Sequence, residues 1–205
     1  MYHEGEPMTT ETKDELLSRL SLMEQMVQDG RRSTTYNGWM FLLWGTGYLV
    51  AIGWVYFLPH PNLAWPVIMT LTAIAGALVQ SAKSKAQPQT TQSRALAGIW
   101  ISMGCSIFLF AFGGAFSHAW TTPQVMLAGI EILIGLANAA SSITLKWKTQ
   151  FVIAIVWWAC GVASFNVVDT LLLPILLAGT LIGNFGFGAY LMALEARDKG
   201  RLAHA

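Results

Sequence analysis

Long hydrophobic runs, with no regular alternation of polar residues, dominate the chain from about residue 38 onward. A transmembrane helix needs about 20 such residues, whereas a transmembrane strand needs about 10 residues of alternating polarity. The runs carry at most one charged residue each, so the pattern predicts an all-α, polytopic membrane protein with a six-transmembrane-helix bundle. The six predicted spans are 38–58, 63–82, 95–116, 124–145, 149–168 and 170–194.

The composition agrees with a membrane protein and argues against a water-soluble fold. Of 205 residues, 54% are hydrophobic and 11% are charged, against about 25% charged residues in a typical soluble domain. A water-soluble fold is therefore excluded, and six spans leave no room for a second large domain. We expect a cytoplasmic acidic arm at 1–36, the transmembrane domain at 37–195 and a basic tail at 196–205.

Basic residues predict the orientation, because cytoplasmic loops collect lysine and arginine. Every basic residue falls before the first span, between the second and third, between the fourth and fifth, or after the sixth. Both termini are thus expected in the cytoplasm, and the protein in the cell (inner) membrane. The bases are Lys13, Arg19, Arg31, Arg32, Lys83, Lys85, Arg94, Lys146, Lys148, Arg197, Lys199 and Arg201.

The loops on the opposite side are short, so the spans are expected to form three antiparallel helical hairpins. The hairpins resemble one another weakly, since a tryptophan recurs in the first helix of each and a proline near the start of each returning helix. The alternative is chance, because tryptophan occurs nine times and proline is tolerated at helix starts. The recurring residues are Trp44, Trp100, Trp157, Pro66, Pro123 and Pro174.

The N-terminal arm holds one predicted amphipathic helix at 12–29. Thr12 and Glu15 form a capping box, and an apolar stripe follows at helical spacing. Because the polar face is acidic, anionic lipid would not attract this helix, and nucleic acid would not bind it. We expect it to fold back on the basic loops, to pair with a neighbouring subunit or to bind a protein partner. The stripe consists of Leu16, Leu20, Met23 and Val27.

A single acid, Glu131, lies inside a predicted span, and intramembrane acids are functional candidates by default. It belongs to a polar and small-residue seam on one helix face, with no basic residue in any span to neutralise it. Glu131 is therefore expected to be protonated, to face water or to bind a cation. The alternative is that Glu131 and Asn138 join helices by hydrogen bonds, which Glu131→Gln would largely preserve. The seam is Gln124, Ala128, Glu131, Gly135, Asn138 and Ser142.

Two further features of the spans allow two interpretations each. The glycine-rich segment 179–188 favours close helix packing, or a local helix break that brings Asn184 beside Glu131. The deep tryptophans Trp100, Trp157 and Trp158 serve either as packing or as the wall of an apolar ligand cavity.

Other chemistry receives little support. Cys105 and Cys160 are not a C-x-x-C pair, no histidine pair lies in the spans for a haem, and no catalytic motif occurs, so we expect neither an enzyme nor a cofactor. His60, His118 and Asp169, in the outer loops, are weak candidates for a shared metal.

The leading hypothesis is an integral membrane binding or permeation protein. Its site, in the outer half of the bundle, comprises Glu131, Asn138 and Asn184 with the tryptophan wall. The ligand would be a lipophilic molecule, a proton or a small cation, and a homo-oligomer is expected because six helices leave little interior in one subunit. The alternative is a non-transporting regulatory or scaffold protein that acts through its acidic N-terminal helix.

Overall fold

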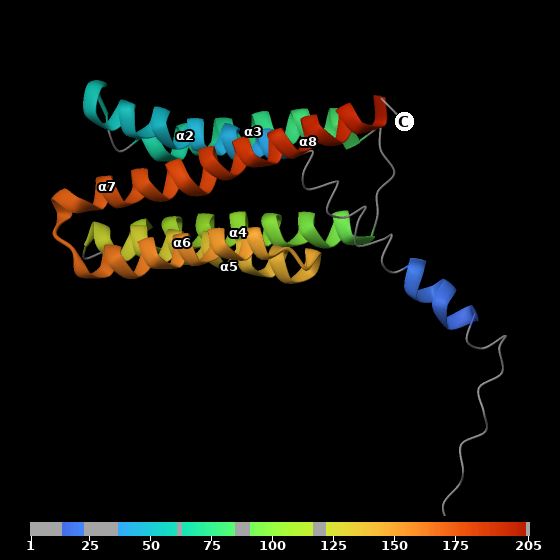
Figure 1. The fold of residues 1–205 in the computed structure, drawn as a ribbon. Helices are drawn as coiled ribbons and strands as arrows, with labels where there is room; N and C mark the ends of the chain where they lie inside the picture. The colour runs from blue at the N-terminus through green and yellow to red at the C-terminus, as the bar shows by residue number, and fades with distance from the viewer. Residues whose placement is uncertain (1–13, 23–36, 61–62, 85–90, 117–121, 204–205) are drawn as a thin grey trace, which may run out of the picture.

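The computed structural model describes residues 14–22, 37–60, 63–84, 91–116 and 122–203, and these ranges are helical apart from short connections (Figure 1). Six of the helices are long and apolar enough to cross a membrane, which confirms that prediction. The observed bounds lie within a few residues of the predicted ones, except that the last helix continues to residue 203. The helices are α2 (Gly38–Phe57), α3 (Ala64–Ser84), α4 (Thr91–Phe116), α5 (Pro123–Leu145), α6 (Lys148–Asn166) and a C-terminal helix of three parts.

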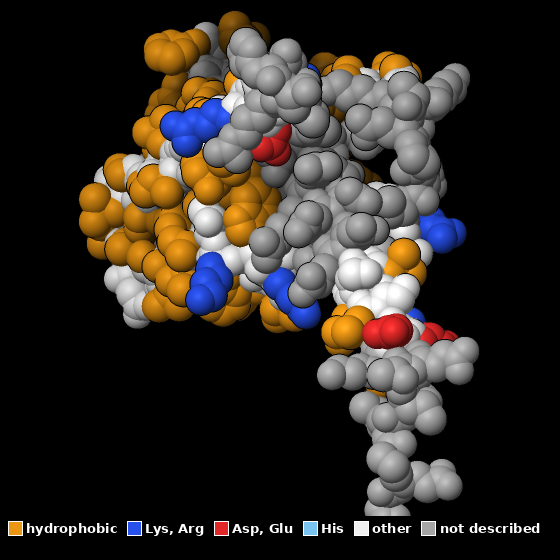
Figure 2. Space-filling model, turned by 45° about the vertical axis from the view of Figure 1, so that its right-hand side comes forward, with side chains coloured by type: hydrophobic (Ala, Val, Ile, Leu, Met, Phe, Trp, Pro, Cys, Tyr) orange, Lys and Arg blue, Asp and Glu red, His pale blue; other side chains and the backbone are white. Residues whose placement is uncertain are grey.

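The bundle has two layers (Figure 1). Helices α2 and α3 pack against each other in one layer, and α4, α5 and α6 form the other, with α5 between its two neighbours. Much of the described surface is apolar, with Lys and Arg side chains at only a few places (Figure 2). Such a surface suits hydrocarbon rather than water.

The C-terminal helix joins the two layers. Its first part, α7 (Asp169–Thr180), packs on α5 and α6, and its last part, α8 (Phe187–Ala203), packs on α2. Between them, η2 (Leu181–Gly186) is a π-helical segment that contacts both α2 and α6. The glycine-rich segment is therefore widened into a π-turn without a break in the helix. Segments of this kind occur often at functional sites.

The turn between α5 and α6 is tight. Lys146 adopts a left-handed conformation, with φ of 49°, and its N–H donates to the carbonyl of Ile143. The N–H of Trp147 donates to the carbonyl of Ser142 at 2.9 Å. These bonds satisfy carbonyls at the end of α5 and reverse the chain within two residues, so α5 and α6 lie side by side.

Part of the N-terminal arm is described, and residues 14–22 form a helix whose side chains are all exposed. Glu15 and Arg19 form an ion pair at 2.6 Å, one helical turn apart. Leu16 and Leu20, the first two residues of the predicted stripe, are half exposed. The other stripe residues and Thr12 of the capping box lie outside the described residues.

Candidate functional site

Glu131 lies in the interior of the bundle, with none of its surface exposed. The hydroxyl of Ser164, on α6, donates a hydrogen bond of 2.7 Å to the Oε2 atom of Glu131. The other carboxyl oxygen, Oε1, is buried and has no hydrogen-bond partner among the described residues. A carboxyl group that is shielded from solvent and half satisfied has capacity for one further hydrogen-bonding group.

Small residues bring α5 and α6 close enough for this contact. A Cβ added at Gly161 would lie 2.8 Å from Ile132 and 3.2 Å from the carbonyl oxygen of Ala128. Because Gly161 has no side chain, the two backbones approach each other one turn before Ser164. Gly135, one turn after Glu131, likewise leaves room for the ring of Trp158. This use of small residues is typical of helix contacts in membranes.

The predicted seam on α5 faces the interior. Ala128, Glu131, Gly135, Asn138 and Ser142 are all buried. At the N-terminal end of α5, the partly buried Gln124 donates a hydrogen bond to the carboxylate of Asp169, at the first residue of α7.

Two further side chains interact electrostatically with Glu131. Tyr48 of α2 and Cys160 of α6 both lie within range of electrostatic interaction with its carboxyl group. Glu131 therefore interacts with side chains of two other helices, α6 and α2.

Other buried polar atoms, on α5, α6 and the C-terminal helix, also lack a hydrogen-bond partner among the described residues, and together with Glu131 Oε1 they are called the buried row here. The amide nitrogen of Asn138 donates to the carbonyl of Ile134 at 3.0 Å, which leaves its Oδ1 atom without a partner in the described part of the chain. Gln150, fully buried at the start of α6, has neither amide atom paired. Unpaired buried polar groups are costly, so each of them favours a bound water, proton or ligand. The row comprises Glu131 Oε1, Asn138 Oδ1, Ser141 Oγ, Gln150 Nε2 and Oε1, Thr180 Oγ1 and Asn184 Nδ2.

The antiparallel packing of α5 and α6 sets the order of this row. Glu131, in the first half of α5, meets Ser164 near the end of α6, and Ser141 and Gln150 lie near the turn that joins the two helices. Asn138 lies two turns from Glu131, about 10 Å along α5. The polar atoms therefore extend over about half of the thickness of a hydrocarbon core of about 30 Å.

Asn184 enters the interior from the π-helical segment. A Cβ at Gly45 of α2 would lie 3.0 Å from the Cβ of Asn184, so these two residues touch where α2 meets η2. Tyr48, one turn along α2 from Gly45, interacts electrostatically with Glu131. The face of α2 that carries Gly45 is thus in contact with Asn184.

The three tryptophans each have a packing partner. Trp157 is 1% exposed, and its indole ring covers Gly179 and Gly183 of the C-terminal helix. Trp158 covers Gly135 and donates from its indole nitrogen to the carbonyl of Ile132 at 3.3 Å. Trp100 makes an edge-to-face contact with Phe41 at a centroid distance of 5.7 Å. In this conformation all three pack against protein.

The weak metal candidates gain no support from geometry. Asp169 accepts a hydrogen bond from Gln124, and His118 lies outside the described residues. The ranges that the structure describes contain no cluster of three or more His, Cys, Asp or Glu residues.

Several residues of this site were not predicted. Ser164, Gln150, Thr180 and Ser141 are fully buried, yet the sequence reading passed over them as ordinary members of apolar spans. Their signal was present, because a polar side chain in a span tends to face other helices rather than lipid.

No known protein family, curated protein or solved structure matches this chain.

Proposed function

We propose that this multi-pass membrane protein is a permeation protein that carries protons, with Glu131 as the group that binds the proton in transit. The single observation that carries the proposal is the Oε1 atom of Glu131, a fully buried carboxyl oxygen without a partner among the described residues. An acid in this position is expensive to keep, and intramembrane carboxyls are typical of proton relays.

The chemistry of the site favours a proton over the other ligands considered. A dehydrated metal cation needs several oxygen ligands, whereas Glu131 offers one unpaired oxygen beside a hydroxyl that already donates to it. A lipophilic molecule needs an apolar cavity, but the deep tryptophans are packed against glycines and against Phe41. A proton needs only an acceptor and a chain of hydrogen-bonding groups.

The buried polar row supplies the chain. The hydroxyl groups of Ser141 and Thr180 and the amide groups of Asn138, Asn184 and Gln150 can each hold a water molecule by hydrogen bonds. In this proposal a proton enters from the outer side near Gln124, binds Glu131 and passes along these groups toward the α5–α6 turn.

The proposal includes a topology. All described Lys and Arg residues of the bundle lie at helix ends or turns, in the last turn of α3, in the first turn of α4, at the α5–α6 turn and in the last turns of α8. We infer that these mark the cytoplasmic side of the cell (inner) membrane, with both termini inside and three antiparallel hairpins. We also propose a homo-oligomer, because much of α3 and α4 is uncovered in the single chain.

Proton flux into liposomes tests the proposal directly. The purified protein is reconstituted with a pH-sensitive dye inside the vesicles, and a potassium gradient with valinomycin supplies the driving voltage. We expect acidification above that of empty vesicles, and at least tenfold slower flux for Glu131→Gln, because an amide does not release a proton.

Glu195→Gln is the matched control. Glu195 lies in the middle of α8 and forms an ion pair of 2.7 Å with Lys199, so its substitution removes an acid outside the row. We expect its flux to equal that of the wild type. Wild-type proton flux no greater than in empty vesicles would refute the proposal, and so would equal flux through the wild type and folded Glu131→Gln. Sodium flux that depends on Glu131 would identify a metal cation, instead of a proton, as the permeating ion.

A second function, a scaffold acting through the N-terminal arm, is favoured by one observation. Leu16, Leu17, Leu20 and Leu22 are 44–59% exposed on the helical segment 14–22. Exposed leucines on an acidic helix suit a protein surface. If this function applies, deletion of residues 1–30 should abolish co-purification of a partner and leave proton flux unchanged.

A further inference from the structure

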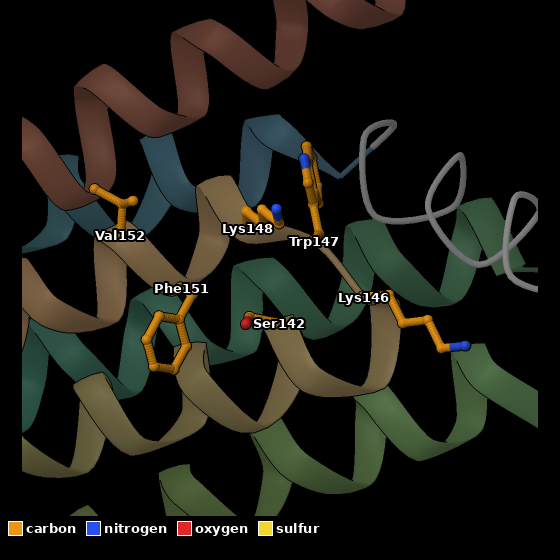
Figure 3. Close-up of a pocket in the computed structure, with 6 residues that line it drawn as sticks. All are labelled: Ser142, Lys146, Trp147, Lys148, Phe151 and Val152. Atoms are coloured by element: carbon orange, nitrogen blue, oxygen red, sulfur yellow. The ribbon is translucent and has the colours of Figure 1, made fainter.

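A groove lies at the turn between α5 and α6, at the opposite end of the buried row from Glu131 (Figure 3). Its volume is about 490 Å³, and it is shallow and largely open to the surface. The residues that line it include two bases and no acid: Ser142, Lys146, Trp147, Lys148, Phe151 and Val152.

The tight turn creates the arrangement of the bases. Lys146 is the left-handed residue that ends α5, and Lys148 is the first residue of α6, so one tryptophan separates them. Both lysines are exposed. Figure 3 shows them at the turn, with Phe151 and Val152 one turn further along α6. The charged groups are therefore at one end of the groove and the apolar groups are further along it.

The aromatic walls are held by neighbouring rings. Trp147 packs against Phe187 of α8 at a centroid distance of 5.9 Å, and Phe151 meets Trp158 edge to face at 6.2 Å. Phe151 is 39% exposed and Val152 is 56% exposed, so both keep a free apolar surface beside the groove. The walls are fixed by packing, and the free surface is left for an occupant.

The position of the groove narrows the class of occupant. Its lysines lie at the end of two membrane-spanning helices, where the hydrocarbon core meets the headgroups, and its apolar residues lie on the hydrocarbon side. A soluble phosphate compound would not cover the exposed apolar surface of Phe151 and Val152, and a purely apolar ligand would not interact with the ammonium groups of the two lysines. Basic pockets beside membrane helices bind anionic lipid headgroups.

We propose that this groove is a binding site for one anionic phospholipid. The phosphodiester interacts with the ammonium groups of Lys146 and Lys148, and the upper part of an acyl chain lies along Phe151 and Val152. Trp147 lies at the level of the glycerol backbone, as interfacial tryptophans do. The lipid fixes the α5–α6 turn, beside the inner end of the buried row.

Native mass spectrometry of the detergent-solubilised full chain tests this site with phosphatidylglycerol and phosphatidylcholine as probes. We expect one phosphatidylglycerol per chain, bound at least tenfold more tightly than phosphatidylcholine. The double variant Lys146→Gln/Lys148→Gln should lose that preference. Glycerol 3-phosphate, which has the headgroup charge without acyl chains, should not compete.

The control variant Arg94→Gln/Lys199→Gln removes two charges outside the groove. It should retain phosphatidylglycerol within twofold of the wild type. Equal losses of phosphatidylglycerol affinity in both double variants would show general surface attraction only and would refute the site. Equal affinity of the wild type for the two lipids would also overturn the proposal. Competition by glycerol 3-phosphate would identify a soluble ligand instead of a lipid. If the groove variant does not fold, the lipid comparison on the wild type and the single variant Lys148→Gln decide the matter.

Discussion

Helices α4 and α5 lie side by side, yet they differ in what surrounds them. α4 is the more apolar of the two, but only 6% of its membrane-length stretch is buried by protein, whereas α5 is less apolar and 50% of its stretch is buried. In a membrane, greater apolarity marks the surface, because lipid solvates leucine as well as protein does. The interior is marked instead by small and polar residues, and α5 carries Glu131 and Asn138 there.

The same contrast separates the glycines of the two helices. A Cβ at Gly135 of α5 would collide with the ring of Trp158, whereas a Cβ at Gly98 or Gly104 of α4 would meet nothing within 4 Å. Glycine therefore permits close packing in α5, and in α4 it leaves a surface that the single chain does not cover. The comparison predicts that equivalent substitutions in the two regions will have different effects.

The largest effect on stability is expected for Gly183→Ala in η2. The new methyl group would collide with the indole nitrogen of Trp157, a ring that is fixed between α6 and the C-terminal helix. Overpacking of this kind costs about 1–3 kcal/mol. The free energy of unfolding, measured by titration with SDS in mixed micelles, should fall by this amount.

Gly98→Ala is the control for this prediction. It adds the same methyl group to a helix position with open space around it, and alanine is the better helix former. Its stability should equal or slightly exceed that of the wild type. If both variants lose the same amount, the distinction between a packed bundle interior and an open α4 is wrong.

A smaller loss is expected for Ser164→Ala. It removes the one hydrogen bond that Glu131 accepts from α6 and leaves both carboxyl oxygens without a partner in the described structure. Hydrogen bonds between membrane helices average about 0.6 kcal/mol, so the free energy of unfolding should fall by about this amount. In a Glu131→Leu background the same substitution should have no effect, because its partner is gone. An equal loss in both backgrounds would show that Ser164 acts through packing alone.

The location of the spans could be predicted from the sequence, because span length and hydropathy are local properties. The second span was predicted at 63–82 and α3 is Ala64–Ser84. The seam on α5 was also within reach, since helical periodicity places Glu131 and Asn138 on one face. What faces that seam was not, because the pairing of Glu131 with Ser164 depends on the rotation and register of a second helix.

The π-helical segment could not be predicted from the sequence, because its conformation also depends on packing against another helix. Segment 179–188 has glycines that permit close packing, a helix break or a widened turn, and the choice depends on the ring of Trp157 against Gly179 and Gly183. The packing partners of the deep tryptophans could not be predicted from the sequence either. Depth in a span could be predicted for Trp157 and Trp158, but the glycines against which they pack could not.

A stability gain is expected for Gln150→Leu, in contrast to the losses above. Both amide atoms of Gln150 are buried without a partner in the described chain, and leucine has a similar volume with no polar atom. Removal of unpaired polar groups is neutral or stabilising, so the free energy of unfolding should rise by up to about 1 kcal/mol. Proton flux in the liposome assay should fall at the same time. A gain in stability without a loss of flux would remove Gln150 from the proposed path.

The smallest effect is expected for Leu109→Ala on α4. Leu109 is 68% exposed in the single chain, so lipid replaces most of what the side chain touches, and the free energy of unfolding should change by less than about 0.5 kcal/mol. The measurement also tests the uncovered surface of α4. A loss above about 1 kcal/mol that grows as the protein-to-lipid ratio rises would mean that a second subunit covers Leu109. In that case the low burial of α4 would describe the monomer only, and the contrast with α5 would be one between an interface and a core.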